Sequence, residues 1–450
     1  MNDVSGSSTY CTDDQRGFCF TPIGATSERG GGTGSGSSGG IVLGSQRHGY
    51  SSLRETALSH SMSALLLATL ALFVALASIF GRWIERLISL TPKTLEPPKL
   101  YHRDSPLSQY LVTHCSSLTK PYYPTIWATN AHLQSLVLPM LPQKWVSFNR
   151  EYLQMDDNGL VGIDNARPAG WTLYTTSPIM LIVPDLNLDC RSVSDLTWIA
   201  MLRGYRVLVF NRRGHGGMPL TTPKLQSYGD ASDLRETVSY VHQNYPDAKL
   251  SAVGIGAGGG LLISFLGEYG SSTDLSAAVC ISPEYNCQEL YEAHKIGQPY
   301  HWLALQRAKL FLREHIGCLA KVIDPVAAFG ATSLAKFEEI VFAKIHKTPD
   351  MEEYWESNNP LREADEISAP LLCLNSKDDP VHPSDLIPYD LFTTLPDVML
   401  ATTTRGGHCG FYEGFRPQSW AHRVTVDYID TVLQYIASVK TGTTHKTHRV

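Results

Sequence analysis

Charged residues are scarce in this 450-residue chain: they make up 18% of it, whereas soluble domains typically carry about 25%. Acidic residues outnumber lysine and arginine by 43 to 37, and a net charge of -6 gives no argument for nucleic acid binding. The nine cysteines include no CxxC pair, so neither a zinc site nor a disulfide framework is predicted. We expect no metal or cofactor, and we expect several cysteines to be small buried side chains.

A long uncharged run covers residues 62–80. As a helix it would extend about 28 Å, close to the thickness of a bilayer core. Apolar residues occur all round it without a polar stripe, which favours a membrane span over residues 61–81 rather than a buried core helix. The run begins about sixty residues into the chain behind a polar tail, which argues against a cleaved signal peptide.

The flanks of this run predict its orientation. Basic residues are more frequent after it than before it, which favours a cytoplasmic C-terminal domain. The sequence contains no Asn-x-Ser/Thr sequon, in agreement with that topology. We expect a single-pass protein of the endoplasmic reticulum membrane, with the bilayer as its partner. The expected divisions are a Gly/Ser-rich disordered tail over 1–48, the span, an interfacial helix and linker over 82–100, a globular domain over 101–438 and a flexible tail over 439–450.

Strand-like and helix-like segments alternate from about residue 145, which is typical of an α/β sheet. The inner strand-like segments are continuous apolar runs, as in parallel strands covered on both faces. The expected strands are 145–155, 179–184, 205–211, 250–255, 277–282, 371–375 and 398–402. Between residues 283 and 370 the alternation stops, and 302–313 and 334–346 look helical. We expect an insertion over about 284–369 that forms a lid.

Residues 252–260 read Ala-Val-Gly-Ile-Gly-Ala-Gly-Gly-Gly between a strand-like run and an apolar helix-like run. This pattern resembles the strand-turn-helix motif G-x-S-x-G, whose serine is a nucleophile, but its central residue is Gly256. The same residues also satisfy G-x-G-x-x-G, the phosphate-binding loop of dinucleotide-binding proteins. That alternative is weaker, because the loop lies in mid-chain and no βαβ unit with a suitably placed acidic residue is evident.

Asp379 and His408 follow the last two expected strands, in the chain order of acid and base that a serine hydrolase of this type requires. Each also has a plain interpretation, because Asp-Asp-Pro is a common turn and His408 stands in a glycine-rich loop. Their order after correctly placed strands favours the catalytic interpretation. Asp378 is the alternative acid.

Four segments together resemble the AB hydrolase superfamily: 127–135, 210–217, 375–380 and 406–411. The similarity covers roughly residues 95–438 and is greatest to the branch often called family four, which contains membrane-anchored abhydrolase-domain lipid esterases related to bacterial YheT-like esterases. The resemblance implies an α/β-hydrolase fold with a mostly parallel sheet. It also implies hydrolysis of carboxylic esters, particularly the acyl chains of glycerolipids or phospholipids.

Carried over position by position, the resemblance makes Asp379 the acid and His408 the base, and it puts Gly256 at the nucleophile position. The backbone N–H groups of the oxyanion hole fall to Leu186 and Ala257. Without a side-chain oxygen at position 256 no acyl-enzyme forms there, and loss of a catalytic serine lowers kcat about a millionfold.

Asp185 is a second difference from the family, because the resemblance implies a glycine at this position. Its carboxylate would bring negative charge close to a developing oxyanion. Cys409 is disfavoured as a substitute nucleophile, because a neighbour of His408 in the same loop normally points elsewhere. The sequence therefore predicts a membrane-anchored pseudoenzyme that retains acyl-lipid binding. The alternatives are an active serine-type lipid esterase and a non-catalytic scaffold.

Overall fold

The computed structural model describes residues 96–167, 170, 172–186 and 188–441. The expected N-terminal tail, membrane span and most of the linker lie outside these residues. None of the helices in the described ranges is long and apolar enough to cross a membrane. The span over 61–81 therefore stays a prediction.

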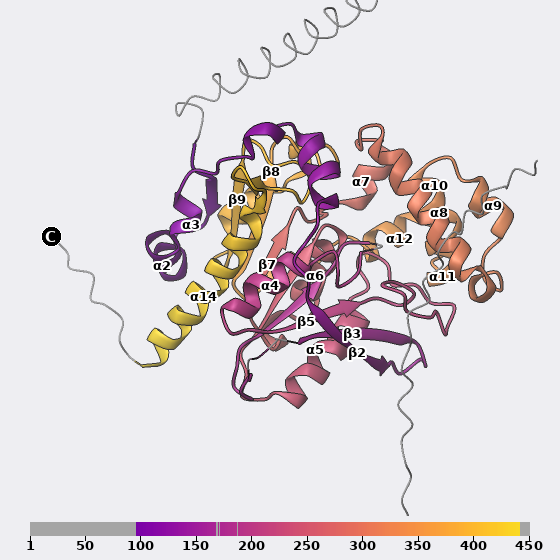
Figure 1. Cartoon of the computed structure of the whole chain (residues 1–450). Helices are drawn as coiled ribbons and strands as arrows, with labels where there is room; N and C mark the ends of the chain where they lie inside the picture. The colour runs from indigo at the N-terminus through magenta and orange to yellow at the C-terminus, as the bar shows by residue number, and fades with distance from the viewer. Residues whose placement is uncertain (1–95, 168–169, 171, 187, 442–450) are drawn as a thin grey trace, which may run out of the picture. The chain divides into compact units, whose positions relative to one another are not determined.

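A nine-stranded sheet forms the centre of the fold, in the order β1-β9-β8-β7-β6-β4-β5-β3-β2 (Figure 1). The six strands from β9 to β5 pair in parallel, whereas β1, β2 and β3 pair antiparallel at the two ends of the sheet. The prediction of a mostly parallel sheet is confirmed. The strands are β1 Lys99–His102, β2 Ser147–Gln154, β3 Leu160–Arg167, β4 Ile179–Val183, β5 Arg206–Asn211, β6 Leu250–Ile255, β7 Leu275–Ile281, β8 Leu371–Ser376 and β9 Val398–Thr403, with a small hairpin of β10 Tyr412–Glu413 and β11 Gln418–Ser419.

Strand β3 is absent from the sequence prediction, for a physical reason. It contains Gly162, Asp164 and Asn165, residue types that are depleted in strands. The structure buries Asp164, which accepts hydrogen bonds from Arg150 on β2 and from Asn211 on β5. Contacts between strands therefore outweigh the unfavourable local composition of β3.

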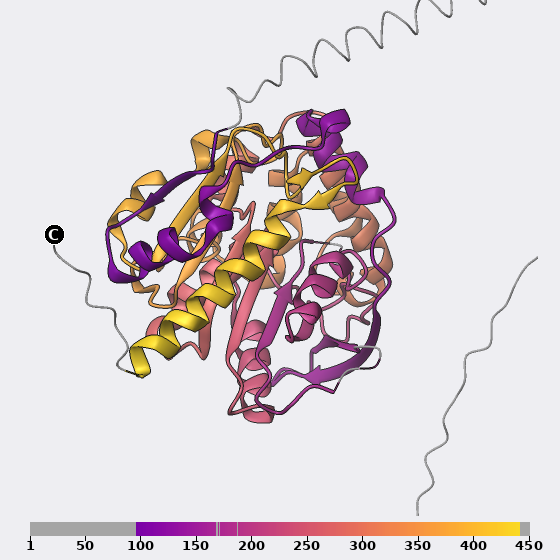
Figure 2. The same cartoon turned by 60° about the vertical axis from the view of Figure 1, so that its left-hand side comes forward.

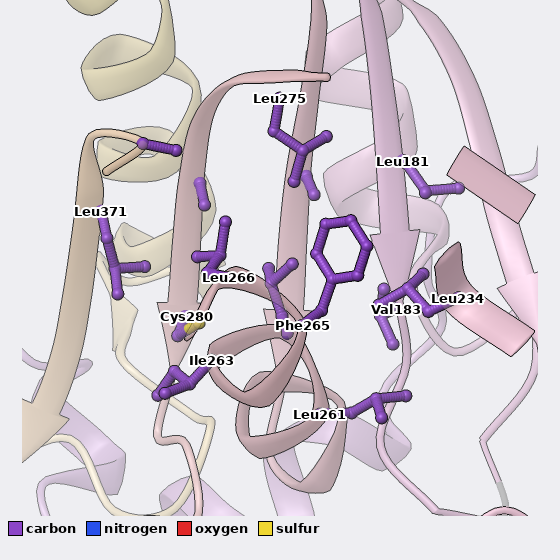
Figure 3. Close-up of a cluster of buried hydrophobic side chains, with 14 of the residues drawn as sticks. Leu181, Val183, Leu234, Leu261, Ile263, Phe265, Leu266, Leu275, Cys280 and Leu371 are labelled. Carbon is purple, nitrogen blue, oxygen red and sulfur yellow. The ribbon is translucent and has the colours of Figure 1, made fainter. Parts of the chain in front are cut away.

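Helices cover both faces of the sheet (Figures 1 and 2). Residues of α2, α4 and α14 share one apolar cluster with one face, and residues of α5, α6 and α13 share another cluster with the opposite face. Alternate side chains of β4 enter the two clusters, as the pleat of a strand requires. Figure 3 shows Phe265 of α6 on the side of Val183 of β4, and Leu266 on the side of Cys280 of β7. The helices are α2 Pro106–His114, α4 Ser194–Leu202, α5 Ser232–Asn244, α6 Ala257–Tyr269, α13 Tyr389–Thr394 and α14 Trp420–Lys440.

The segment between β7 and β8 folds into six helices with an apolar cluster of their own (Figure 1). Four of these helices begin at a residue whose side chain accepts a backbone hydrogen bond, namely Asn286, Asp324, Ser333 and Asp350. The helix expected over 334–346 is interrupted at Val341. The helices are α7 Cys287–Glu292, α8 Tyr300–Leu319, α9 Pro325–Gly330, α10 Leu334–Ile340, α11 Phe342–His346 and α12 Met351–Ser357.

Short helical turns complete the described chain. They are α3 Ser116–Thr119, η2 Ile126–Ala128, η3 Leu133–Val137, η4 Leu138–Met140, η5 Gly270–Ser272, η6 Ala364–Glu366 and η7 Ser384–Leu386. Of these, η2 and η3 overlap the segment 127–135, which carries part of the family resemblance. In this segment His132 Nδ1 lies 2.8 Å from the Tyr300 hydroxyl of α8. This segment therefore contacts the helical insertion.

A buried acid in the insertion makes the stability of the protein depend on pH. Glu338 on α10 is 3% exposed and accepts a 2.6 Å hydrogen bond from the Tyr354 hydroxyl. Burial raises the pKa of Glu338 from an ordinary 4.5 to about 8. The folded state therefore keeps a proton that the unfolded chain releases, and the free energy of unfolding falls as the pH rises from about 4.5 to about 8.

Glu338→Gln is expected to remove most of this pH dependence and to stabilise the protein at pH 8 by a few kcal/mol. Denaturant unfolding at pH 5 and at pH 8 measures the effect. Glu352→Gln, on the exposed part of α12, is the matched control and should leave the pH dependence unchanged. An identical pH profile for Glu338→Gln and the native protein would contradict the assignment.

Candidate functional site

Gly256 stands at the sharp turn between β6 and α6. Its backbone has φ +55° and ψ -123°, a conformation that non-glycine residues adopt only under strain. Its N–H donates to Ile281 O of β7 at 2.9 Å, and its carbonyl accepts from Gly259 N at 2.9 Å. A Cβ at Gly258 would come within 2.1 Å of Val183 O, so α6 packs against the end of β4 only because this residue has no side chain. The strand-turn-helix arrangement of the glycine cluster is thus present.

The side chain of Asp185 fills the space that a nucleophile would need. A Cβ at Gly256 would lie 2.6 Å from Asp185 Cγ and 2.7 Å from its Oδ1. The same Oδ1 accepts a 2.9 Å hydrogen bond from Ala257 N, the N–H group that the resemblance assigns to the oxyanion hole. Leu186, the other residue assigned to that hole, follows in the same loop and packs against the insertion. The carboxylate therefore takes up both the nucleophile space and one expected oxyanion donor.

Asp379 and His408 are brought together at the ends of β8 and β9. His408 Nδ1 lies 3.0 Å from Asp379 Oδ2. The other carboxylate oxygen of Asp379 accepts backbone hydrogen bonds from Val381 at 2.8 Å and His382 at 2.9 Å, which fix its orientation. Asp378, the alternative acid, instead accepts from Gly407 N at 2.9 Å and from a neighbouring serine hydroxyl. Asp379 is therefore the acid that faces His408.

Charge complementarity sets the protonation of this pair. Burial raises the pKa of Asp379, but the charge and hydrogen bond of His408 outweigh it and hold that pKa below its usual value. Burial lowers the pKa of His408, whereas the charges of Cys409 and Asp379 raise it, and the net result is well above the usual value. The imidazole is thus held as a strong base beside a fixed carboxylate.

Cys409 lies against His408, and the expectation that it points elsewhere is wrong. Its Sγ is 3.5 Å from His408 Nε2 and 3.7 Å from Ile281 O. The backbone of Cys409 has φ +54°, and its N–H donates to Ser282 Oγ at 3.1 Å. This unusual backbone conformation turns the thiol toward the ring of the preceding residue, and spacing in the sequence carries no signal for it.

Arg212 and Arg213 are buried residues of the segment 210–217, and sequence reasoning gave neither a role. Arg212 Nη2 donates to Ala257 O at 3.0 Å, while its Nε and Nη1 have no acceptor among the described residues. Arg213 forms a two-pronged ion pair with Asp233 at 2.7 Å and also pairs with Asp157. The signal available in the sequence was a pair of arginines directly after an apolar strand.

Removing Asp233 is expected to destabilise the fold by about 3 kcal/mol, because it leaves the buried Arg213 charge with only the half-exposed Asp157 as partner. Denaturant unfolding of Asp233→Ala measures the loss. Glu339→Ala is the control, since Glu339 forms a surface ion pair with the half-exposed Lys336 and should cost less than about 1 kcal/mol. Equal losses for the two variants would contradict this ranking.

Asp379, His382 and His408 also offer ligand atoms that all lie within 4.8 Å of one another. The ring of His382 packs edge-to-face on His408 with centroids 4.9 Å apart, and its Nε2 lies 3.4 Å from Glu284 Oε1 without a hydrogen bond. The hydrogen bond between Asp379 and His408 already uses one ligand atom of each. The expectation that the protein needs no metal stays a prediction.

The sequence of this chain is similar to those of several known proteins. The family described as "Serine aminopeptidase, S33" matches residues 176–337, which include the elbow around Gly256. "Protein ABHD15" of Homo sapiens is 37% identical over 325 residues, which are 69% of this chain and 69% of that protein. The chain belongs to the AB hydrolase superfamily.

"Phospholipase ABHD3" of Mus musculus is 29% identical over 378 residues, 80% of this chain and 91% of that protein. "Monoacylglycerol lipase ABHD2" of Danio rerio is 29% identical over 376 residues, 78% of this chain and 87% of that protein.

An AB hydrolase of this kind has an α/β-hydrolase fold with a mostly parallel central sheet, as the resemblance implied. Two of its relatives are named as lipid hydrolases, so its resemblance to ester hydrolases is established. The site differs from that of a serine hydrolase at the nucleophile position. In this AB hydrolase the acid and base stand in contact, but the elbow residue Gly256 has no side chain and Asp185 fills the space in front of it.

Proposed function

We propose that this protein is a membrane-anchored AB hydrolase of the family-four, YheT-like branch that binds acyl lipids but does not hydrolyse them through a serine. One observation carries the proposal: the carboxylate of Asp185 lies where the side chain of a nucleophile at position 256 would stand, and it accepts the Ala257 N–H. Asp379 and His408 serve as the acid and base of an incomplete triad.

Two losses of catalytic rate separate this site from that of a working serine hydrolase. Loss of a catalytic serine costs about a millionfold in kcat, or about 8 kcal/mol of barrier height. Removing one oxyanion donor costs a further 10²- to 10³-fold, roughly. Asp185 causes the loss of the oxyanion donor, because a negative charge on Ala257 N–H repels an oxyanion instead of stabilising it. Its side chain also occupies the space of the missing serine. Both losses together make serine-type turnover negligible.

The helical insertion supports acyl binding at the elbow. Ala257 belongs to the same apolar cluster as Tyr291 and Leu305 of the insertion, and Leu186 packs against this cluster. A ligand at the elbow would therefore meet apolar side chains of the lid. The relatives named as a phospholipase and a monoacylglycerol lipase point to an acylglycerol or phospholipid as the ligand class.

The membrane anchor rests on the uncharged run over 62–80, with the hydrolase domain in the cytoplasm. Full-length protein expressed in cells should stay with membranes through alkaline carbonate extraction. A protein that begins at residue 96 should not. Full digestion of the domain by protease added to intact microsomes would support the cytoplasmic orientation, and complete protection would contradict it.

The functional test uses purified full-length protein in detergent micelles with a monoacylglycerol and a phosphatidylcholine. We expect saturable binding of a fluorescent acyl analogue without repeated release of fatty acid. Steady release of fatty acid would favour an active esterase. Absence of both binding and release would favour a scaffold.

A further inference from the structure

We propose that Cys409 is the nucleophile of a Cys409–His408–Asp379 relay, which accepts the acyl group of an activated acyl ester and holds it as a thioester. This inference rests on the proposed acyl binding. It assigns a covalent step to a site whose serine position is a glycine.

The three side chains form a continuous chain of contacts. Cys409 Sγ lies 3.5 Å from His408 Nε2, and His408 Nδ1 lies 3.0 Å from Asp379 Oδ2. Two backbone N–H groups fix the Asp379 carboxylate, and Ser135 Oγ accepts the His408 N–H at 2.8 Å. Nucleophile, base and orienting acid thus stand in the arrangement that cysteine-based acyl transfer requires.

The thiol lies close to the backbone of the turn at Gly256. Ile281 O accepts the Gly256 N–H at 2.9 Å and lies 3.7 Å from Cys409 Sγ. The side chain of His408 is 16% exposed, and Cys409 is only partly buried. A carbonyl carbon bound at the elbow would therefore come close to this sulfur.

A second polar group, Arg212, contacts the residue that follows Gly256. The Arg212 guanidinium is 4% exposed, and its Nη2 is fixed on Ala257 O, but its Nε and Nη1 have no acceptor among the described residues. Buried donors in native proteins are nearly always paired, so these two nitrogens favour an oxygen acceptor next to Ala257, either an ordered water molecule or an oxygen of a ligand.

The chemistry balances without an added oxidant or metal. His408 Nε2 takes the thiol proton while Sγ attacks the carbonyl carbon, and a carbon–sulfur bond forms. The ester carbon–oxygen bond breaks, and the leaving alcohol receives the proton from His408. Burial raises the pKa of Cys409, so the thiol keeps its proton and the step needs the neutral form of His408 as its base. With Asp185 on Ala257 N–H, we expect acylation to be slow and close to stoichiometric.

The test treats full-length protein in micelles with p-nitrophenyl butyrate and measures nitrophenolate release together with the mass of each cysteine peptide. We expect about one butyryl group per chain, on Cys409, removed by hydroxylamine. Cys409→Ala should abolish it, and His408→Asn should slow it at least about 100-fold. Asp185→Gly should speed it at least about tenfold by freeing the Ala257 N–H.

Cys318→Ala is the matched control, because Cys318 is also a partly exposed free thiol, and it should leave the labelling of Cys409 unchanged. The relay is overturned if Cys409 stays unmodified while Cys318 reacts, or if His408→Asn leaves the rate on Cys409 unaltered in a folded protein. Each of these outcomes is measured as the mass of a covalent adduct on a cysteine peptide. They are distinct from failure of the proposed function, which shows as absent binding of the acyl analogue or as serine-dependent turnover.

Discussion

Gly256→Ser combined with Asp185→Gly is expected to give ester hydrolysis that neither substitution gives alone. The double variant should exceed the native protein at least about 10³-fold in kcat/KM, within the roughly 10⁶-fold that a catalytic serine supplies. The missing hydroxyl would then stand on a turn that already has the strained strand-to-helix backbone of a nucleophile elbow, with φ +55° and ψ -123°.

The single substitutions should fail for different reasons. Gly256→Ser alone places a Cβ 2.6 Å from Asp185 Cγ, so either the carboxylate or the turn must move, and the Ala257 N–H stays engaged. Asp185→Gly alone frees that N–H but supplies no hydroxyl.

Initial rates with p-nitrophenyl butyrate and a monoacylglycerol, measured in the Cys409→Ala background, isolate the contribution of the serine. Gly204→Ser is the matched control, because Gly204 has φ +84° and open space around its missing Cβ. It should fold normally and add no activity. A folded double variant without hydrolysis would remove the support for this elbow as a vacant nucleophile site.

His408→Ala in the restored double variant is expected to lower kcat by about 10⁴-fold or more, because His408 is the imidazole that Asp379 orients as the base. Asp379→Asn should cost a comparable factor, since the amide no longer stabilises the imidazolium. Asp378→Asn is the matched control: it faces Gly407 N instead of the imidazole and should change kcat much less.

The pH dependence of the restored enzyme gives an independent check. A general base acts when it is neutral, and Asp379 and Cys409 raise the pKa of His408 above its usual value. Hydrolysis should therefore still increase with pH above the range in which an ordinary histidine titrates. Equal losses for Asp378→Asn and Asp379→Asn would contradict the assignment of the acid.

Much of the fold was predictable, because the inner strands of a parallel sheet are apolar on both faces and so stand out as continuous runs such as Leu250–Ile255. Strand β3 was not, since its polar residues are stabilised by partners on β2 and β5. The helix expected over 334–346 divides at Val341, a break that apolar patterning does not reveal.

The site shows a similar division. Chain order was enough to select Asp379 and His408, because loops after parallel strands meet at one edge of the sheet. The direction of two side chains was not predictable. Asp185 turns into the elbow, and Cys409 turns toward His408, and both orientations depend on backbone conformation and long-range contacts.

Labelling with a serine-directed fluorophosphonate tests the central claim most directly. The native full-length protein should show no serine adduct by peptide mass mapping, whereas the Gly256→Ser, Asp185→Gly double variant should carry one adduct at position 256 that is lost on His408→Ala. A serine adduct in the hydrolase domain of the native protein would show that a serine nucleophile exists and would contradict the account.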